Sequence, residues 1–192
     1  TLHKYEKAIS NPVNPSRINK FIKERVFVLS QLINEFRKQA LVLQEAIFKK
    51  EISFKSIHGD PKLTNFLFDS FTNKPIALID LDTVQPGIIH YDIGDCLRSC
   101  CNTSGEEPSL LKDVYFDSKL LDSFLKGYFL IYGPYLTQQD IYYLPYSIQI
   151  ITFELGLRFL TDFLTGNTYF RTEIDNQNLY RAEVQFKLLL SI

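Results

Sequence analysis

Residues 57–69 read IHGDPKLTNFLFD and set three polar side chains between two apolar segments. His58 and Gly59 precede Asp60, a combination that on its own often makes only a turn. Asn65 follows where an apolar, strand-like run begins. A carboxylate at the apex of such a loop can accept the proton of an attacking hydroxyl, and an amide oxygen can bind a metal ion. We therefore take Asp60 as a candidate general base and Asn65 as a candidate metal ligand.

The next segment, residues 77–84, reads ALIDLDTV and has the pattern of a short buried strand that ends in two carboxylates. Asp80 and Asn65 supply two hard oxygen ligands, which suit Mg²⁺ because this ion keeps water and phosphate oxygens in its other positions. The D-x-x-x-x-N spacing from Asp60, followed by a strand-end Asp, is typical of the phosphoryl-transfer loops of kinases. Asp82 is either a further metal ligand or a brace of the turn.

The remaining polar residues of this region are assigned supporting roles. Lys62 either neutralises charge near a transferred phosphate or is a solvated loop lysine. We expect His58 to orient the loop rather than to react. Asp92, Asp95 and Arg98 share one face of a predicted helix, and carboxylates beside a catalytic loop more often brace it by hydrogen bonds than perform chemistry.

The composition is that of a soluble globular domain. The 192 residues, 45% hydrophobic and 22% charged, are enough for one well-cored domain. Lys and Arg (21) nearly balance Asp and Glu (22) without any basic run, so nucleic-acid and membrane-surface partners are not indicated. There is neither a membrane-span-length apolar stretch nor a signal-peptide core, so we expect a cytoplasmic protein with a small-molecule partner. Cys96, Cys100 and Cys101 lack metal-site spacing and are interpreted as buried, reduced thiols.

Apolar spacing predicts an α+β fold that is predominantly helical, with the candidate loop on a small β-patch. Residues 1–16 are polar and interrupted by prolines, and they are interpreted as a lead-in segment. From Ser16, a residue type that favours N-caps, helical spacing predicts one long helix, or two with a bend, to about residue 50. Polar residues 69–75 predict a hairpin turn. We expect β segments at 56–58, 65–68 and 75–81, and further helices at 92–101, 118–131, 138–164 with a bend at Pro145, and 178–191.

Taken together, IHGDPKLTNFLFD and LIDLDTVQPGIIHYDIGDCLRS resemble the aminoglycoside phosphotransferase and choline kinase superfamily, whose members share the protein-kinase fold. The resemblance is closest to the N-acetylhexosamine 1-kinase type. In that type LDTV-x-PG, a YD-x-GD-x-(I/L)R helix, an Asn-Thr pair (Asn102-Thr103) and a G-x-RFLTD segment (residues 156–162, GLRFLTD) occur together. The resemblance runs from about residue 57 to the C-terminus, and the order of several motifs makes it more specific than HGD alone.

The resemblance implies a kinase that uses ATP and Mg²⁺ to phosphorylate an amino sugar, such as an N-acetylhexosamine, at its anomeric hydroxyl. Carried over by motif, Asp60 is the catalytic base, and Asn65 and Asp80 bind Mg²⁺ on the ATP phosphates. Thr83 and Arg158 are placed at the sugar pocket, where a guanidinium can grip hydroxyls or an amide carbonyl. Other members of the superfamily act on aminoglycosides, choline or homoserine with the same catalytic residues, so these acceptors stay open.

The residues around Arg158 also allow a structural reading. Glu154 and Asp162 are near it on the same predicted helix, and either would make an ion pair with it. Tyr169 and Phe170 are most simply interpreted as core residues. A stacking role for them against a sugar ring has no support in the sequence.

The kinase pattern is incomplete in one respect. A kinase fold needs an N-terminal lobe with a Gly-rich loop over the phosphates and a strand Lys paired to a helix Glu. No G-x-G-x-x-G occurs here, and no strand-like segment precedes residue 50. The chain also begins at Thr1 and contains no methionine. We therefore expect it to be the C-terminal lobe alone, a fragment with the ATP-clamping N-terminal lobe missing and with little or no activity of its own.

Two readings from other classes compete with the kinase. A strand followed by D-x-D-x-V also begins haloacid-dehalogenase-like phosphatases, in which Asp80 would be the nucleophile and Asp82 the acid/base. Such enzymes need further parallel strands, whereas the sequence after Asp92 predicts helices, and this reading leaves Asp60 and Asn65 without a role. The other alternative is an inactive lobe or interaction module.

Overall fold

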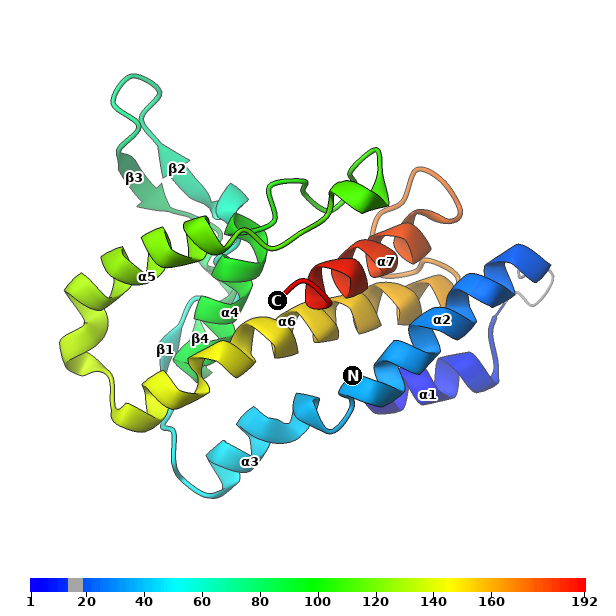
Figure 1. The fold of residues 1–192 in the computed structure, drawn as a ribbon, viewed down its shortest axis with the longest axis horizontal. Helices are drawn as coiled ribbons and strands as arrows, with labels where there is room; N and C mark the ends of the chain where they lie inside the picture. The colour runs from blue at the N-terminus through cyan, green and yellow to red at the C-terminus, as the bar shows by residue number, and fades with distance from the viewer. Residues whose placement is uncertain (14–18) are drawn as a thin grey trace. The chain divides into compact units, whose positions relative to one another are not determined.

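The computed structural model of this chain describes residues 1–13 and 19–192. Helices dominate (Figure 1), and the strands of the described residues form two small antiparallel pairs, so the prediction of a predominantly helical α+β chain is confirmed. The chain divides into two compact units. The first unit comprises Thr1–Leu41, Ser104–Tyr115 and Thr152–Ile192, and the second comprises Val42–Thr103 and Phe116–Ile151.

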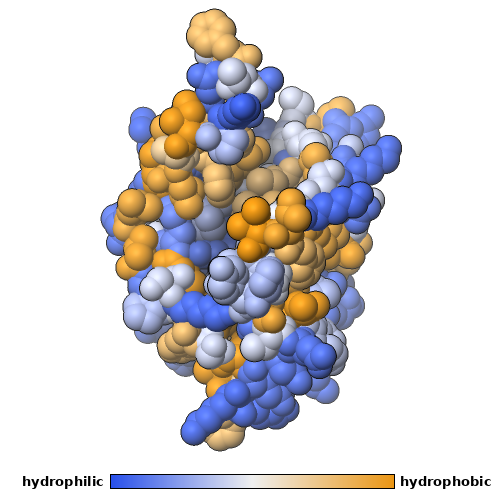
Figure 2. Space-filling model, turned by 90° about the vertical axis from the view of Figure 1, so that its left-hand side faces the viewer, coloured by the Kyte–Doolittle hydropathy of each residue, from blue (hydrophilic) through white to orange (hydrophobic). Residues whose placement is uncertain are grey.

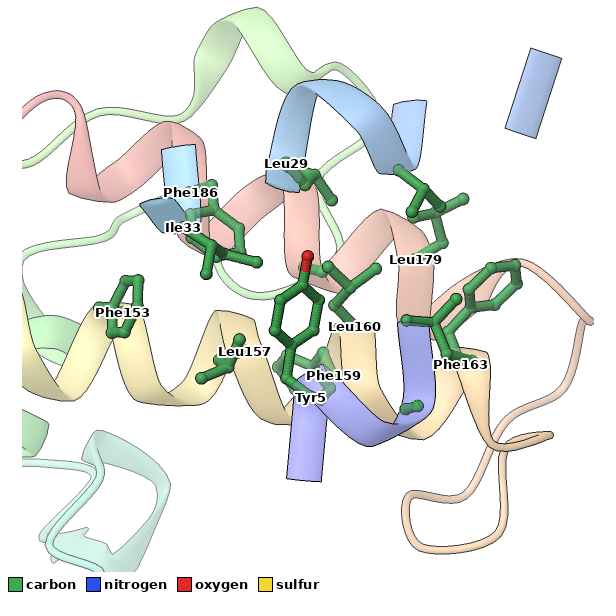
Figure 3. Close-up of a cluster of buried hydrophobic side chains, with 14 of the residues drawn as sticks. Tyr5, Leu29, Ile33, Phe153, Leu157, Phe159, Leu160, Phe163, Leu179 and Phe186 are labelled. Carbon is green, nitrogen blue, oxygen red and sulfur yellow. The ribbon is translucent and has the colours of Figure 1, made fainter. Parts of the chain in front are cut away.

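The first unit is built from helices around one apolar core. Its elements are α1 (Leu2–Ser10), α2 (Lys20–Phe36), the C-terminal part of α6 (Gln138–Leu164) and α7 (Gln177–Leu189). Figure 3 shows side chains from these helices converging, with Tyr5 of α1, Ile33 of α2, Leu157 of α6 and Phe186 of α7 among them. Such buried side chains each contribute about 1.5–3 kcal/mol to the free energy of folding, so this core fixes the helices of the unit.

Helix α1 is an addition to the sequence-based prediction, which assigned no helix before residue 16. Tyr5 and Ala8 are buried in it, and Leu2 and Ile9 pack partly against the same core. The sequence LHKYEKAIS is mostly polar and only a narrow face of the helix is apolar. For this reason the segment was interpreted as a polar lead-in and not as a helix.

The long helix predicted up to residue 50 is divided, which confirms the alternative with a bend. It consists of α2, a 3₁₀ turn at Gln39–Leu41 and α3 (Val42–Phe48). The predicted N-cap, Ser16, lies outside the described residues. Helix α2 begins at Lys20, where the side chain of Asn19 accepts a hydrogen bond from the Ile22 amide at 2.9 Å. Such a cap contributes about 1 kcal/mol to helix stability.

The second unit contains both strand pairs and the helices next to them. Strand β1 (Lys55–Ile57) pairs with β4 (Gln85–Gly87), and β2 (Phe66–Phe68) pairs with β3 (Pro75–Leu78). The hairpin between β2 and β3 is visible in Figure 1 and confirms the predicted turn, whereas β4 was not predicted. Helix α4 (Ile89–Cys100) begins three residues earlier than predicted, and α5 (Ser118–Tyr132) follows the prediction closely.

Helix α6 begins at Gln138, as predicted, and hydrogen bonds between residues next to its first turn fix this start. The Thr137 hydroxyl accepts from the Asp140 amide at 3.0 Å, while the Asp140 carboxylate accepts from the Thr137 amide at 2.9 Å. This reciprocal pair is a capping box, which satisfies two of the amides that a helix start leaves unpaired. The helix is continuous through Pro145.

The strand predicted at 75–81 is confirmed over Pro75–Leu78 (β3), but the expectation that it is buried is wrong. All four residues of β3 are exposed, with Ile76 at 65% and the following Ile79 at 41% of full exposure. Within the described residues, no third strand pairs with this two-stranded hairpin. Figure 2 shows one face of the molecule, on which hydrophobic and hydrophilic patches alternate. Exposed apolar side chains of the hairpin region include Leu67, Phe68 and Phe71.

Candidate active site

The loop after β1 is held to helix α4 by one carboxylate. The amides of His58 and Gly59 donate to the two oxygens of Asp92, at 2.7 and 2.9 Å. Asp92 lies in the first turn of α4 and uses its carboxylate for the loop instead of for the helix end. This confirms the bracing role predicted for Asp92. Arg98 and Asp95 form an ion pair on the same helix at 2.9 Å, with Arg98 buried.

The ring of His58 links the loop to the end of the β2–β3 hairpin. Its Nε2 lies 2.9 Å from the carbonyl oxygen of Ile79, and the Asp60 amide donates to its Nδ1 at 3.3 Å. A carbonyl oxygen can only accept, so Nε2 carries the proton and Nδ1 is the acceptor. Both ring nitrogens are therefore engaged with the backbone, in keeping with the orienting role expected for His58.

Gly59 and Thr83 are packed against each other by backbone geometry. Gly59 has a φ of +88°, and a Cβ at this position would lie 2.7 Å from the carbonyl oxygen of Thr83. The Thr83 hydroxyl donates to the carbonyl of His58 at 2.7 Å. A glycine is required here both by its left-handed backbone and by this close approach. Thr83 thus has a structural contact with the loop in addition to its predicted place at a sugar pocket.

Three of the predicted site residues come together around Asn65. Its buried Nδ2 donates to the carbonyl oxygen of Asp60 at 2.7 Å and lies 3.4 Å from Oδ2 of Asp60 and from Oδ2 of Asp80. Because Nδ2 must face the Asp60 carbonyl, Oδ1 is the atom of this amide that can bind a cation. The backbone carbonyl of Asn65 accepts from the Ile79 amide at 3.0 Å, which fixes the loop beside the strand end.

Lys62 forms an ion pair with the candidate base. Its Nζ lies 2.6 Å from Oδ2 of Asp60, and both side chains are about one-third exposed. The hydrogen bond to Asp60 raises the pKa of Lys62 above its ordinary value of 10.5, with smaller contributions from the charges of Asp80 and Asp95. Lys62 therefore stays an ammonium throughout the physiological range, next to the carboxylate.

Asp80 has a left-handed backbone, with φ 68° and ψ 56°, which few residues other than Gly adopt without strain. Its side chain is exposed and lies near that of Asn65. Asp82 is exposed in the following 3₁₀ turn, Leu81–Thr83. Asp is one of the residue types that adopt this conformation more readily than other non-glycine residues, because its short polar side chain can form local hydrogen bonds.

Ser99 is a further anchor of the loop, and the sequence did not indicate it. Its hydroxyl oxygen accepts a hydrogen bond from the Leu63 amide at 2.8 Å, and the same hydroxyl donates to the carbonyl oxygen of Cys96 at 3.3 Å. A serine in the last turn of a helix is too common to predict such a contact. The last turn of α4 therefore holds the loop between Lys62 and Asn65.

Arg158 lies in the first unit and contacts two aromatic rings. Its Nη2 lies 3.2 Å from the Tyr169 hydroxyl, and its guanidinium carbon lies 5.4 Å from the Tyr169 ring centre and 5.3 Å from that of Phe170. Such cation–π contacts contribute about 0.5–1 kcal/mol each at exposed sites. Tyr169 is 73% exposed, so its assignment to the core is wrong, whereas Phe170 does pack partly against the core.

Asp162 has partners other than Arg158. This buried carboxylate accepts from the backbone amides of Thr168, Tyr169 and Phe170 at 2.8–2.9 Å and from the side chain of Asn178 at 2.9 Å. It fixes the loop that carries the two rings next to Arg158. The reading of Arg158 as an ion partner of Asp162 is therefore wrong.

The donor set of the second unit suits a small, hard cation. Within residues 1–13 and 19–192, no group of three or more His, Cys, Asp or Glu side chains is arranged to hold a metal ion. The site has instead the amide of Asn65, whose Nδ2 lies 3.4 Å from the exposed carboxylate of Asp80 and whose Oδ1 is left for a cation; this set of few protein ligands leaves room for water and phosphate oxygens. These residues fit Mg²⁺ bound together with a phosphate-bearing ligand, and they do not fit a closed metal cage.

A carboxylate base candidate with a neighbouring ammonium, next to an Asn–Asp pair, is the side-chain set that phosphotransferases of the kinase type use. The sequence profile of the Phosphotransferase enzyme family (APH) matches residues 26–134, more than half of the chain. The chain belongs to this family. The matched segment includes all the candidate residues of the second unit and ends before Arg158. No helix in the described ranges is long and apolar enough to cross a membrane.

Proposed function

We propose that the protein is an ATP-dependent small-molecule kinase, that residues 1–192 form the C-terminal lobe of its kinase-like fold, and that Asp60 is its catalytic base. The observation that carries this proposal is that Asp60 and Asp80 meet at the Asn65 amide, each with a carboxylate oxygen 3.4 Å from Nδ2. Membership of the Phosphotransferase enzyme family supports the reaction class.

Asp60 orients the acceptor hydroxyl and takes its proton as the phosphoryl group is transferred. Its backbone carbonyl is held by Asn65 and its amide by His58, so the carboxylate starts from a fixed position. Positioning of this kind is the main contribution of a protein to phosphoryl transfer. Lys62, whose ammonium lies 2.6 Å from Asp60, neutralises negative charge at the acceptor side of the site.

Asn65 and Asp80 bind Mg²⁺ in this proposal, with Asp82 as a secondary ligand. When bound there, Mg²⁺ would neutralise charge on the ATP phosphates. The left-handed backbone at Asp80 turns the chain directly after the hairpin, which leaves this carboxylate exposed beside the amide of Asn65.

The acceptor is an amino sugar, an N-acetylhexosamine phosphorylated at its anomeric hydroxyl. The proposal of this substrate is based on the resemblance of the LDTV-x-PG and GLRFLTD motifs to those of the N-acetylhexosamine 1-kinase type. Thr83 of the second unit is the proposed sugar contact, and the role of Arg158, in the first unit, stays a prediction of the resemblance. The Arg158 guanidinium is exposed and has donors beyond the one that reaches Tyr169. Aminoglycoside, choline and homoserine kinases of the same superfamily are the alternatives for the acceptor.

The other two readings account for less of the geometry. A dehalogenase-type phosphatase would use Asp80 as a nucleophile among parallel strand ends, but both strand pairs of the described residues are antiparallel. It would also leave the Asp60–Lys62 pair without a role. An inactive lobe or interaction module requires neither the exposed carboxylate of Asp80 nor its approach to Asn65.

The experiment is an acceptor panel with the full-length protein, ATP and Mg²⁺, read by phosphorus NMR. We expect N-acetylglucosamine 1-phosphate as the product, and we expect Asp60→Asn to abolish its formation. Asp122→Asn, an isosteric change of an exposed carboxylate on α5, is the matched control and should leave the rate unchanged. If phosphate is transferred only to choline or to an aminoglycoside, the amino-sugar acceptor is ruled out, but the assignment as a small-molecule kinase still holds. Phosphatase activity that survives in Asp60→Asn and is lost in Asp80→Asn would contradict the proposal that the protein is a kinase.

A further inference from the structure

Two of the three cysteines lie in contact one turn apart on helix α4. The Sγ atoms of Cys96 and Cys100 are 3.8 Å apart, and both thiols are free. Cys96 and Cys101 are buried as predicted, but Cys100 is only partly buried and reaches solvent. The pair thus joins one accessible thiol to one protected thiol.

The three thiols differ in reactivity. A hydrogen bond from Cys96 lowers the pKa of Cys100 to about 7, with further help from Ser99 and the charge of Arg98. The same hydrogen bond, together with burial, raises the pKa of Cys96, and burial raises the pKa of Cys101 to about 12. Because the thiolate is the nucleophile, Cys100 is the thiol of this cluster that reacts first near neutral pH.

The thiol pair and the candidate catalytic loop share one helical turn. Ser99 lies between the two cysteines in the sequence, and its hydroxyl accepts the Leu63 amide at 2.8 Å and donates to the Cys96 carbonyl at 3.3 Å. A backbone change between residues 96 and 100 that displaces the Ser99 hydroxyl therefore weakens the hydrogen bond that holds the loop.

We propose that Cys96 and Cys100 are an oxidation site at which a hydroperoxide forms an intramolecular disulfide, and that this disulfide breaks the hydrogen bond between Ser99 and Leu63. The first step forms a sulfur–oxygen bond on Cys100 and breaks the peroxide oxygen–oxygen bond, and the departing oxygen takes a proton. In the second step the Cys96 sulfur attacks the sulfenic acid, the sulfur–sulfur bond forms, and water leaves. Two thiols are oxidised while one hydroperoxide is reduced to an alcohol and water.

The helix allows this disulfide only with a local distortion. Residues one turn apart in a regular helix have Cα atoms about 6.2 Å apart, which is inside the range that disulfides span, about 4.4–6.8 Å. The sulfur atoms must nevertheless close from 3.8 Å to about 2.0 Å, and only the last turn of α4 separates them. Ser99 lies inside the segment that must move.

The test uses peroxide treatment of the whole chain with two readouts that do not depend on kinase activity. The first is mass spectrometry after tryptic cleavage at Arg98, which separates Cys96 from Cys100, so that a disulfide joins two peptides. The second is hydrogen exchange at the Leu63 amide. We expect a linkage between Cys96 and Cys100 that a dithiol reverses, and exchange at Leu63 that is faster by about tenfold in the oxidised protein.

Three variants separate the roles of the thiols. Cys96→Ala should stop at a sulfenic acid on Cys100 that dimedone traps, and Cys100→Ser should form no linkage and show no change at Leu63. Cys101→Ser, the matched control, should still form the disulfide. Three results would each overturn the proposal. In the first, folded wild-type protein does not form this linkage; in the second, Cys101 reacts first. In the third, the disulfide forms but hydrogen exchange at Leu63 stays unchanged.

Discussion

The Nδ2 atom of Asn65 lies 3.4 Å from Oδ2 of Asp80, although the two residues are 15 positions apart. The approach is produced by the β2–β3 hairpin, which begins directly after Asn65 and returns to Asp80. The same Nδ2 donates to the Asp60 carbonyl at 2.7 Å. One buried amide thus joins the candidate base to the candidate metal ligand.

Replacing Asn65 by Ala should destabilise the loop even without any ligand. The change removes the donor to the Asp60 carbonyl, and we expect the free energy of unfolding to fall by about 1–3 kcal/mol. Urea denaturation in the presence of a chelator measures this effect without a contribution from bound cation. A loss below about 0.5 kcal/mol, the size of an ordinary surface substitution, would show that the amide does not organise the loop.

Gly59→Ala should be more harmful than an average glycine replacement. The new Cβ would lie 2.7 Å from the Thr83 carbonyl oxygen on a backbone with φ +88°, and we expect a loss of roughly 1–3 kcal/mol. Gly127→Ala on α5 is the control, because its added Cβ would have no atom within 4 Å apart from its chain neighbours and the nearby backbone of its own helix. That change should be neutral or stabilising by up to about 1 kcal/mol. Equal effects at both positions in chemical denaturation would contradict the close approach at Thr83.

Asp92→Ala should loosen the loop from helix α4. Two amide donors, those of His58 and Gly59, lose their acceptor, and hydrogen bonds to a charged group each contribute about 1.5–3 kcal/mol. Hydrogen exchange at these two amides should accelerate together with a fall in melting temperature. Asp122→Ala, an exposed carboxylate, should change neither quantity, and unchanged protection of the loop amides in Asp92→Ala would argue against the brace.

Stability should decrease in mild acid because of His90. This ring is fully buried, its Nε2 donates to the Asp140 carbonyl at 2.9 Å, and its Nδ1 has no partner in the described part of the chain. Burial lowers the pKa of His90 below its ordinary 6.5, so the unfolded chain takes up the proton first. The stabilisation is complete above pH 6.5 and is lost as the pH falls toward the folded-state pKa, by up to about 1.4 kcal/mol per pH unit.

The comparison for this prediction is His90→Gln, which keeps a donor near the Asp140 carbonyl and does not titrate. Melting temperatures of both proteins from pH 7.5 to 5 should show a flatter profile for the variant. Parallel profiles would mean that other groups cause the acid sensitivity.

Local sequence signals predicted the central part of the candidate site. The Asp60–Asn65 spacing and the polar hairpin turn are short-range features, and together they bring Asp60 and Asp80 to the same amide. The start of α6 at Gln138 was predicted from apolar spacing, which is also a short-range feature.

The remaining features depend on contacts between distant residues. Ser99 is 36 positions from Leu63, and Thr83 is 25 positions from His58. Burial of β3 could not be inferred from its apolar residues, because burial depends on which other element covers a strand. Helix α1 was missed because only a narrow face of it is apolar.

The most direct test of the proposed phosphoryl-transfer site compares the initial rate of phosphate transfer from ATP to N-acetylglucosamine in full-length wild-type and Asp60→Asn proteins. The change preserves the shape of the side chain and removes the base, and we expect the rate to fall by about 10²–10⁴-fold while the melting temperature stays within a few degrees. An Asp60→Asn protein that is folded and transfers phosphate at the wild-type rate would contradict the assignment of Asp60 as the catalytic base.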